Sequence, residues 1–141
     1  MYHIKIFSVG KTKEQWLTDA VNEYEKRLCS TVKFECIWAK HDEQLKVLSA
    51  KEKHLVLLDP NGKLMTSEQF SEFLVDQLEC GGSKLTLIIG GSDGIPKELK
   101  GKGPQLSLSP LTFTHQMTRL ILIEQIYRAL EIEKGSNYHR A

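Results

Sequence analysis

The residue types best suited to chemistry stand at the C-terminal end of the chain. Tyr138, His139 and Arg140 are consecutive, and they offer an aromatic ring, an imidazole that titrates near neutral pH and a guanidinium. Such a set can stack on a base, move a proton and hold a phosphate. A short charged tail is also typical of a frayed terminus, so both interpretations are open on these residues alone.

Two further segments have the composition of ligand-binding loops. Gly90-Gly91-Ser92-Asp93-Gly94 lets the backbone approach a ligand closely, because glycine has no Cβ. This glycine loop lacks the spacing of dinucleotide and P-loop motifs, and a simple tight turn explains it equally well. Leu108-Ser109-Pro110-Leu111-Thr112-Phe113 combines hydroxyls and backbone amides with apolar walls, which suits a ligand of adenosine size. The alternative for this second segment is a strand end followed by a helix cap.

The sequence lacks the motifs of several other catalytic classes. It has no Gly-x-Ser-x-Gly elbow and no His-Glu-x-x-His zinc motif, and no carboxylate cluster indicates a metal ion. Cys29, Cys36 and Cys80 form no Cys-x-x-Cys pair, so we expect reduced cysteines that are buried by packing. We therefore expect a site without a metal ion.

Length and charge narrow the class of protein. The 141 residues fit a single domain over residues 1–141, and 40% hydrophobic residues suffice for a globular core. Nineteen basic and eighteen acidic residues give a net charge of +1, which is not that of a free-standing nucleic-acid binder, so RNA contacts would be local or shared with a partner. No apolar run is long enough to span a membrane and the N-terminus lacks a signal-peptide core, so we expect a cytoplasmic protein.

Hydrophobic periodicity predicts the elements that hold these loops. Alternation or buried apolar runs indicate strands, and 3.6-residue spacing indicates helices. Strands are expected at 2–9, 32–38, 54–58, 85–89 and 106–108, and helices at 13–28, 40–52, from the Thr66 cap to Gly81, and at 115–134. Asp59-Pro60-Asn61-Gly62 is predicted as a turn, and Pro96 as the start of a short helical piece. Strands that alternate with helices indicate an α/β fold with a mainly parallel sheet of about five strands.

The predicted topology gathers three loops at one edge of the sheet. Ligands of open α/β sheets bind beyond the carboxyl ends of the strands. The segment after Leu58, the glycine loop from Gly90 and the segment from Leu108 to Phe113 all follow strands and occupy that edge. The sequence therefore predicts a small-molecule site there.

The last predicted helix has almost no polar face. Apolar residues such as Met117, Leu120 and Ile121 surround it, and one sheet face in a small domain can cover only one side of such a helix. We expect the helix to lie in a homodimer interface, and the alternative is a central core helix within one chain. Glu124 and Arg128 are spaced i, i+4 and are expected to form an ion pair.

The chain closely resembles a known family. Its motifs are the glycine loop, the Leu108–Phe113 segment, the helix sequence Leu-Ile-Glu-Gln-Ile-Tyr-Arg-Ala and the Tyr138-His139-Arg140 tail. Together they resemble the RlmH group, small SPOUT-superfamily methyltransferases that modify a pseudouridine of large-subunit (23S) ribosomal RNA at N3. The resemblance runs from the first strand to the last residues. Thr114 stands where the family usually has proline.

The resemblance implies a fold and a cofactor. The fold is a Rossmann-like SPOUT domain with a C-terminal trefoil knot, an exception to the rule against threaded chains. The implied assembly is a homodimer, and the implied substrate is ribosomal RNA within the assembled ribosome. S-adenosylmethionine (SAM) would supply the methyl group without a metal ion. Its implied contacts are Leu58, Gly90, Leu108, Ser109, Pro110, Leu111, Thr112 and Phe113.

The resemblance also assigns roles to the tail and the last helix. Arg128, Tyr138 and Arg140 would grip or stack the nucleotide. His139 either removes the N3 proton as a general base or positions the RNA while solvent takes the proton. In a dimer, the tail of one subunit would complete the site of the other. The alternative class is a non-catalytic nucleotide-binding or protein-interaction module on the same α/β plan.

Overall fold

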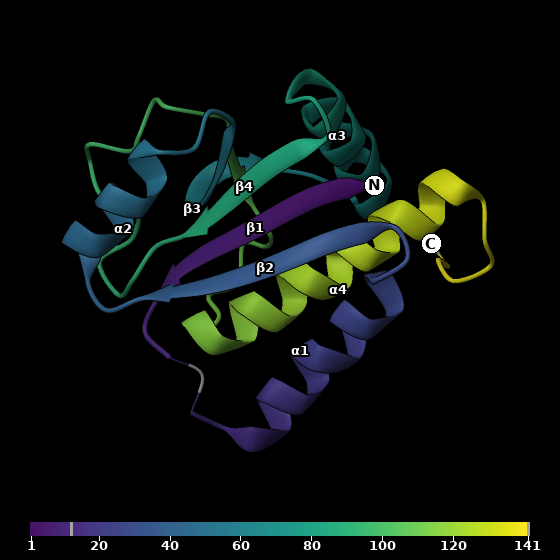
Figure 1. Cartoon of the computed structure of the whole chain (residues 1–141), viewed down its shortest axis with the longest axis horizontal. Coiled ribbons are helices and arrows are strands. Elements are labelled where there is room, and N and C mark those ends of the chain that lie inside the picture. Colours follow the sequence, from purple (N-terminus) through teal and green to yellow (C-terminus); the bar gives the residue numbers. More distant parts are fainter. Residues whose placement is uncertain (12, 141) are drawn as a thin grey trace.

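Strands and helices alternate along the chain, as the periodicity predicted (Figure 1). The computed structural model describes residues 1–11 and 13–140, so Ala141, the last residue of the predicted domain, lies outside the described residues. The strands in the described part are β1 (Tyr2–Val9), β2 (Val32–Ala39), β3 (Leu55–Leu64), β4 (Lys84–Ile89) and β5 (Gln105–Ser107). The helices there are α1 (Gln15–Leu28), α2 (Asp42–Ala50), α3 (Ser67–Cys80) and α4 (His115–Lys134).

The strands form one parallel sheet in the order β2-β1-β4-β3-β5, which confirms the α/β prediction. Alternate residues of each strand face opposite layers. Ile4 and Ile6 of β1 face the core against α1, α3 and α4, whereas Phe7 packs with Leu45 of α2 on the other side. The connections that contain α1, α2 and α3 cross the sheet and pack these helices against it, whereas β4 leads to β5 through the glycine loop and turns without a helix.

β3 is longer than the sequence indicated. Leu58 and Lys63 both align with Leu106 of β5, so the predicted turn at 59–62 forms an irregularity within the strand. The carboxylate of Asp59 accepts a hydrogen bond of 2.8 Å from the backbone N–H of Asn61, as expected of a turn. The turn prediction was correct locally. The prediction that the strand ends at Leu58 was wrong, because β5 pairs with the chain again beyond the turn.

The ends of the helices near the loops are fixed by capping. Thr66 and Gln69 form the predicted capping box at the start of α3. The Thr114 hydroxyl accepts a hydrogen bond of 3.3 Å from the backbone N–H of Met117 and caps α4. Threonine at this position therefore gives α4 a defined first turn. Pro96, by contrast, begins hydrogen-bonded turns rather than a helix, with the Leu99 N–H bonded to its carbonyl.

The cysteine prediction was wrong for two of the three residues. Cys29 and Cys80 are exposed, and Cys36 is half-buried. Cys29 caps the end of α1 and Cys80 is the last residue of α3, and both helices end at the surface. Cys36 in β2 contacts Glu25 of α1, and burial raises the pKa of its thiol well above its usual range.

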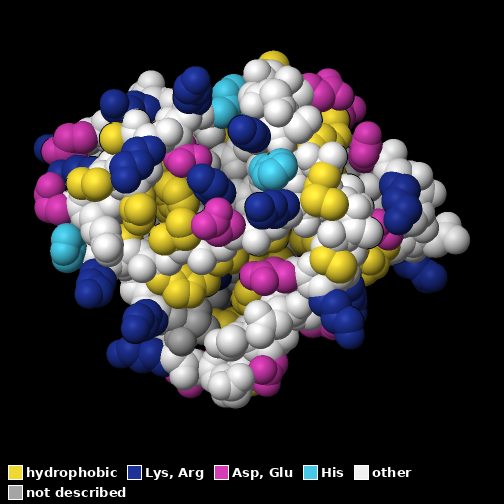
Figure 2. Space-filling view, in the orientation of Figure 1, with side chains coloured by type: hydrophobic (Ala, Val, Ile, Leu, Met, Phe, Trp, Pro, Cys, Tyr) yellow, Lys and Arg dark blue, Asp and Glu magenta, His cyan; other side chains and the backbone are white. Residues whose placement is uncertain are grey.

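The surface carries both signs of charge. On the face shown in Figure 2, Lys and Arg side chains are interspersed with Asp and Glu rather than gathered in one field. This distribution agrees with the net charge of +1. In the part of the chain that the structure describes, no helix combines the length and apolar character needed to cross a bilayer.

Candidate functional site

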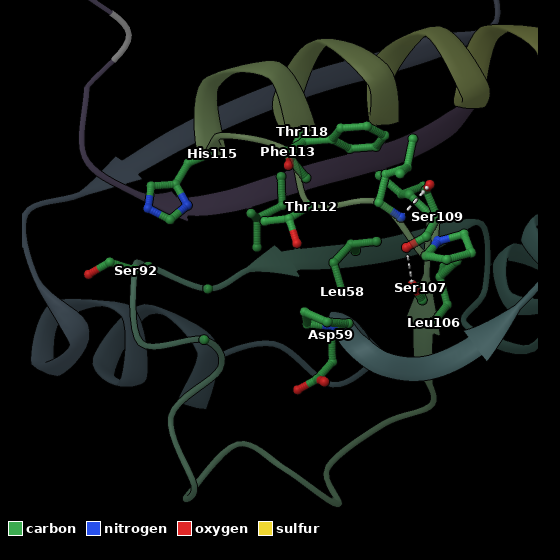
Figure 3. Close-up of a pocket in the computed structure, with 18 residues that line it drawn as sticks. Leu58, Asp59, Ser92, Leu106, Ser107, Ser109, Thr112, Phe113, His115 and Thr118 are labelled. Carbon is green, nitrogen blue, oxygen red and sulfur yellow. Dashed lines mark hydrogen bonds between the residues drawn. The ribbon is translucent and has the colours of Figure 1, made fainter.

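A pocket of about 230 Å³ opens at the carboxyl edge of the sheet (Figure 3). The ends of β3 and β5, the glycine loop, the loop before α4 and the first turn of α4 form its wall. All eight residues expected to contact SAM line it: Leu58, Gly90, Leu108, Ser109, Pro110, Leu111, Thr112 and Phe113. The fold thus brings together side chains from three separate segments, as the topology predicted.

The glycine loop is closed by its own backbone. A Cβ at Gly90 would lie 2.3 Å from the carbonyl carbon of Gly94 and 2.6 Å from the nitrogen of Ile95. The Gly94 N–H also donates a hydrogen bond of 2.9 Å to the carbonyl of Gly91, and Gly94 has a φ of +83°. Gly90 is therefore required by close packing within the loop, and this packing shapes one wall of the pocket.

The loop before α4 is also ordered by local hydrogen bonds. The Ser107 hydroxyl donates to the carbonyl of Ser109 at 3.0 Å, and the Ser109 hydroxyl accepts from the N–H of Leu111 at 2.9 Å. In Figure 3 Thr112 lies beside Leu58, and the His115 ring lies farther to the left, on the side of Ser92; all four residues line the pocket. The pocket therefore combines hydroxyl and imidazole groups with an aliphatic wall, as a nucleoside-like ligand requires.

Asp59 is a pocket residue that the sequence identified only as part of a turn. Its side chain is 6% exposed, and one carboxylate oxygen lies 3.8 Å from the ammonium of Lys100. Figure 3 shows its carboxylate turned away from Thr112, toward the loop that follows the glycine segment. Asp59 therefore shapes the pocket floor by holding the irregular part of β3. An acidic residue directly after a buried strand was the sequence signal for it.

The predicted tail residues form a second cluster around Glu124 of α4. Arg128 and Glu124 pair at 2.9 Å, which confirms the predicted i, i+4 ion pair. The Tyr138 hydroxyl donates a hydrogen bond of 2.7 Å to the same carboxylate, and the Arg128 guanidinium lies 4.9 Å from the centre of the Tyr138 ring. Burial, Glu124 and Tyr24 raise the pKa of Tyr138 above its usual range. These contacts describe a docked tail rather than a frayed one.

His139 joins this cluster to α3. Its Nδ1 lies 3.0 Å from a terminal nitrogen of Arg128, and its Nε2 lies 2.5 Å from a carboxylate oxygen of Glu68. The hydrogen bond from His139 holds the pKa of Glu68 below its usual range. Glu68 is separated from His139 by 71 residues, and no pattern in the sequence pointed to it. Arg140 is exposed at the end of the tail.

The pocket and the tail cluster lie apart on α4. Thr118 lines the pocket and Arg128 follows it ten residues later in the helix, which is about 15 Å at roughly 1.5 Å per residue. Figure 1 shows the C-terminus near the end of α4 that lies opposite His115. Within one chain, the residues expected to contact the cofactor therefore lie together in the pocket. The residues expected to contact the nucleotide lie together at a second place, near the C-terminal end of α4.

The described residues contain no group of three His, Cys, Asp or Glu side chains placed to hold a metal ion. The chemistry that the two clusters offer is ligand binding by loops and hydrogen bonding by the tail. Neither cluster by itself identifies the reaction.

Comparisons with known proteins relate the whole chain to methyltransferases. The family described as Predicted SPOUT methyltransferase matches residues 2–139. Ribosomal RNA large subunit methyltransferase H of Protochlamydia amoebophila is 56% identical over 140 residues, covering 99% of this chain and 100% of the relative. Its namesake in Desulfitobacterium hafniense (strain Y51) is 38% identical over 160 residues, with coverages of 99% and 100%. Among solved structures, a methyltransferase of Legionella pneumophila with bound SAM has a TM-score of 0.51 at 14% identity, covering 92% of this chain and 66% of that chain.

Proposed function

The chain belongs to the SPOUT methyltransferase family, and from this membership we propose that it transfers a methyl group from SAM to N3 of a pseudouridine in 23S ribosomal RNA. The relatives named ribosomal RNA large subunit methyltransferase H support the class of RNA. The resemblance of the loop, helix and tail motifs to the RlmH group supports pseudouridine as the target nucleotide, N3 as the methylated position and the assembled ribosome as the substrate. We assign residues 1–141 to one SPOUT domain, whose C-terminal segment forms a trefoil knot. We also place the protein in the cytoplasm.

One observation carries the proposal: the eight residues expected to contact SAM line a single pocket. The residues present fit that molecule. Leu58 and Leu108 offer aliphatic walls for a purine, and Ser109 and Thr112 offer hydroxyls beside a closely packed glycine loop. When bound, SAM would supply an electrophilic methyl group on its sulfonium. The pocket itself orients this donor, and orientation is expected to lower the barrier more than any other effect when a group passes between two bound partners.

The tail cluster supports the binding of the nucleotide. Arg128, Tyr138 and Arg140 offer two guanidinium groups and one ring within a short stretch of surface, and such groups hold phosphates and stack on bases. The target nitrogen must also lose its proton. Both ring nitrogens of His139 already have partners in this structure. This geometry favours a positioning role for His139, with solvent taking the proton.

The separation of the two clusters supports a homodimer. The tail lies about 15 Å along α4 from the pocket of its own chain, so a second copy must bring its tail to the pocket. α4 is suited to such packing, because Met117 is 36% exposed and Leu120 and Ile121 are only partly buried. Trp16 of the neighbouring helix α1 is 58% exposed. A partner that covers this apolar surface is expected to gain stability from its burial.

The test uses labelled methyl-SAM and ribosomes that lack the modification. We expect label in 23S but not 16S ribosomal RNA. A mixture of two inactive variants tests the dimer: Arg128→Ala retains an intact pocket, and a variant with Thr112→Arg retains an intact tail cluster. Recovery of transfer in the mixture is expected, because a mixed dimer contains one complete site. Equal inactivity of the mixture and of each variant would contradict the shared site.

A further inference from the structure

Glu68 links the tail to α3 through a side-chain hydrogen bond with His139. It stands in the first turn of α3, outside the pocket and 71 residues before His139 in the sequence. The capping of α3 does not depend on it, since Thr66 and Gln69 form the capping box. Its side chain is 51% exposed, whereas that of His139 is 17% exposed. The carboxylate therefore reaches from a solvated position to hold a more buried imidazole.

The hydrogen-bond partners of His139 fix its tautomer. A guanidinium can only donate, so the contact of Nδ1 with Arg128 requires a lone pair on Nδ1. Nε2 then carries the hydrogen and donates it to Glu68. Both nitrogens of the neutral ring are thus in use. In this arrangement the imidazole bridges Arg128 to Glu68, and it has no lone pair left to accept the proton of a substrate.

The bridge holds the groups that we assign to nucleotide binding. Glu124 accepts hydrogen bonds from Arg128 and Tyr138 on one side of the cluster. On the other side, Glu68 holds His139, whose Nδ1 engages the second terminal nitrogen of Arg128. Glu124 of α4 therefore holds the Arg128 guanidinium and the Tyr138 ring directly. Glu68 of α3 holds the other end of the same guanidinium through His139. A guanidinium held in this way loses less conformational entropy when it binds a phosphate.

We propose that Glu68 is a positioning residue for the methyl transfer: it holds His139 in the Nε2–H tautomer and so fixes the tail where Arg128 and Tyr138 meet the nucleotide. This inference rests on the proposed function. Glu68 touches neither SAM nor the reacting nitrogen, and it acts through His139. The same contact explains why His139 contributes to placement rather than to proton removal.

The competing explanation is that Glu68 serves only α3. An acidic residue in the first turn stabilises a helix through its dipole. Glu72 is exposed one turn later on the same helix, outside its first turn, and controls for the loss of a charge from α3 in general. If Glu68 serves only the helix, Glu68→Gln should behave like Glu68→Ala, because both remove the negative charge beside the helix N-terminus. If Glu68 positions His139, Glu68→Gln should retain methyl transfer, because the Gln carbonyl oxygen still accepts a hydrogen bond from Nε2–H.

The test compares Glu68→Ala, Glu68→Gln and Glu72→Ala by two readouts. Nitrogen NMR of the ring, with His139→Asn to assign the signals, reports the tautomer. We expect Nε2–H in the wild type and in Glu68→Gln, and a mixture of tautomers in Glu68→Ala. For methyl transfer we expect kcat/KM to fall about tenfold in Glu68→Ala, the size of one charge-assisted hydrogen bond. Glu68→Gln and Glu72→Ala should stay near the wild type, and SAM binding should be unchanged in all three.

Several results would overturn the inference. Wild-type kcat/KM with an unchanged tautomer in Glu68→Ala would remove Glu68 from the reaction. Equal losses in Glu68→Ala and Glu68→Gln would assign Glu68 to the effect of its charge on α3 alone. These outcomes are distinct from a failure of the proposed function, in which the wild-type chain itself transfers no methyl group to ribosomes.

Discussion

Substitution of Gly90 by alanine tests the pocket most sharply, because the structure defines what the added methyl group meets. The Cβ would lie 2.3 Å and 2.5 Å from the carbonyl carbon and oxygen of Gly94, and 2.6 Å from the nitrogen of Ile95. All three are backbone atoms, so no side chain can move aside. The loop must open, and the hydrogen bond between Gly94 and Gly91 is strained or lost.

The size of the effect follows from this clash. Overpacking of a close contact costs about 1–3 kcal/mol. If the opened loop must close again to form the pocket wall, this cost appears in the binding of SAM as an affinity loss of about 5- to 150-fold. Valine at Gly90 would add χ1 restriction to the same clash, so alanine is the smaller and more informative change.

Gly91→Ala is the matched control. Its Cβ would lie 3.5 Å from the nearest atom of the Val9 side chain, which is an ordinary contact. Titration calorimetry with SAM, together with a thermal melt for each variant, should show weak binding for Gly90→Ala and near wild-type binding for Gly91→Ala. A folded Gly90→Ala protein with unchanged affinity would show that the glycine loop is not part of the SAM site. Equal losses in the two variants would show that the clash at Gly90 is not the cause.

Three other properties follow from the tail and the cysteines. Deletion of residues 138–141 should leave SAM binding by calorimetry intact and abolish methyl transfer, since the pocket uses none of these residues; normal transfer would exclude the tail from the reaction. Tyr138 should ionise later than a free tyrosine in an ultraviolet titration, because burial and Glu124 raise its pKa. Its contribution to tail docking is therefore complete below pH 10 and is lost only as the pH rises through the folded-state pKa. The pKa of Tyr2 is raised too, so Tyr138→Phe should remove one late-titrating signal and leave that of Tyr2. A thiol reagent at pH 8 should modify Cys29 and Cys80 quickly and Cys36 slowly, with all three fast in denaturant; a fast Cys36 in the folded chain would contradict its burial and raised pKa.

Local patterns were sufficient for most of the fold. The alternation in β1, the helical spacing in α1 and the Thr66 capping box each depend on neighbours within a few residues, and the structure confirms them. The extension of β3 depends instead on pairing with β5, about forty residues away in sequence at Leu106, and no local pattern contains that contact. Exposure of Cys29 and Cys80 follows from where two helices end in space, which residue type alone does not determine.

Some features of the site could likewise be predicted from the sequence, and others exist only in the folded chain. The pocket loops were predictable because parallel strands bring their carboxyl ends to one edge, so the position of Gly90 in sequence fixes its position in the sheet. The Glu124–Arg128 pair was predictable from helix geometry. Glu68 was not, because its contact with His139 joins the start of α3 to the C-terminal tail, which meet only in the folded chain. The distance between the tail and the pocket of its own chain likewise required the structure.

The proposed function is tested most directly by locating the methyl group on the product. Ribosomes lacking the modification would be incubated with the wild-type chain and labelled SAM, and the nucleosides of the 23S ribosomal RNA would be separated and analysed by mass spectrometry. We predict one methyl group on N3 of a pseudouridine, in an amount that approaches one per ribosome. SAM binding without any transfer of label to 23S ribosomal RNA, or label on a different nucleoside, would contradict the proposed function.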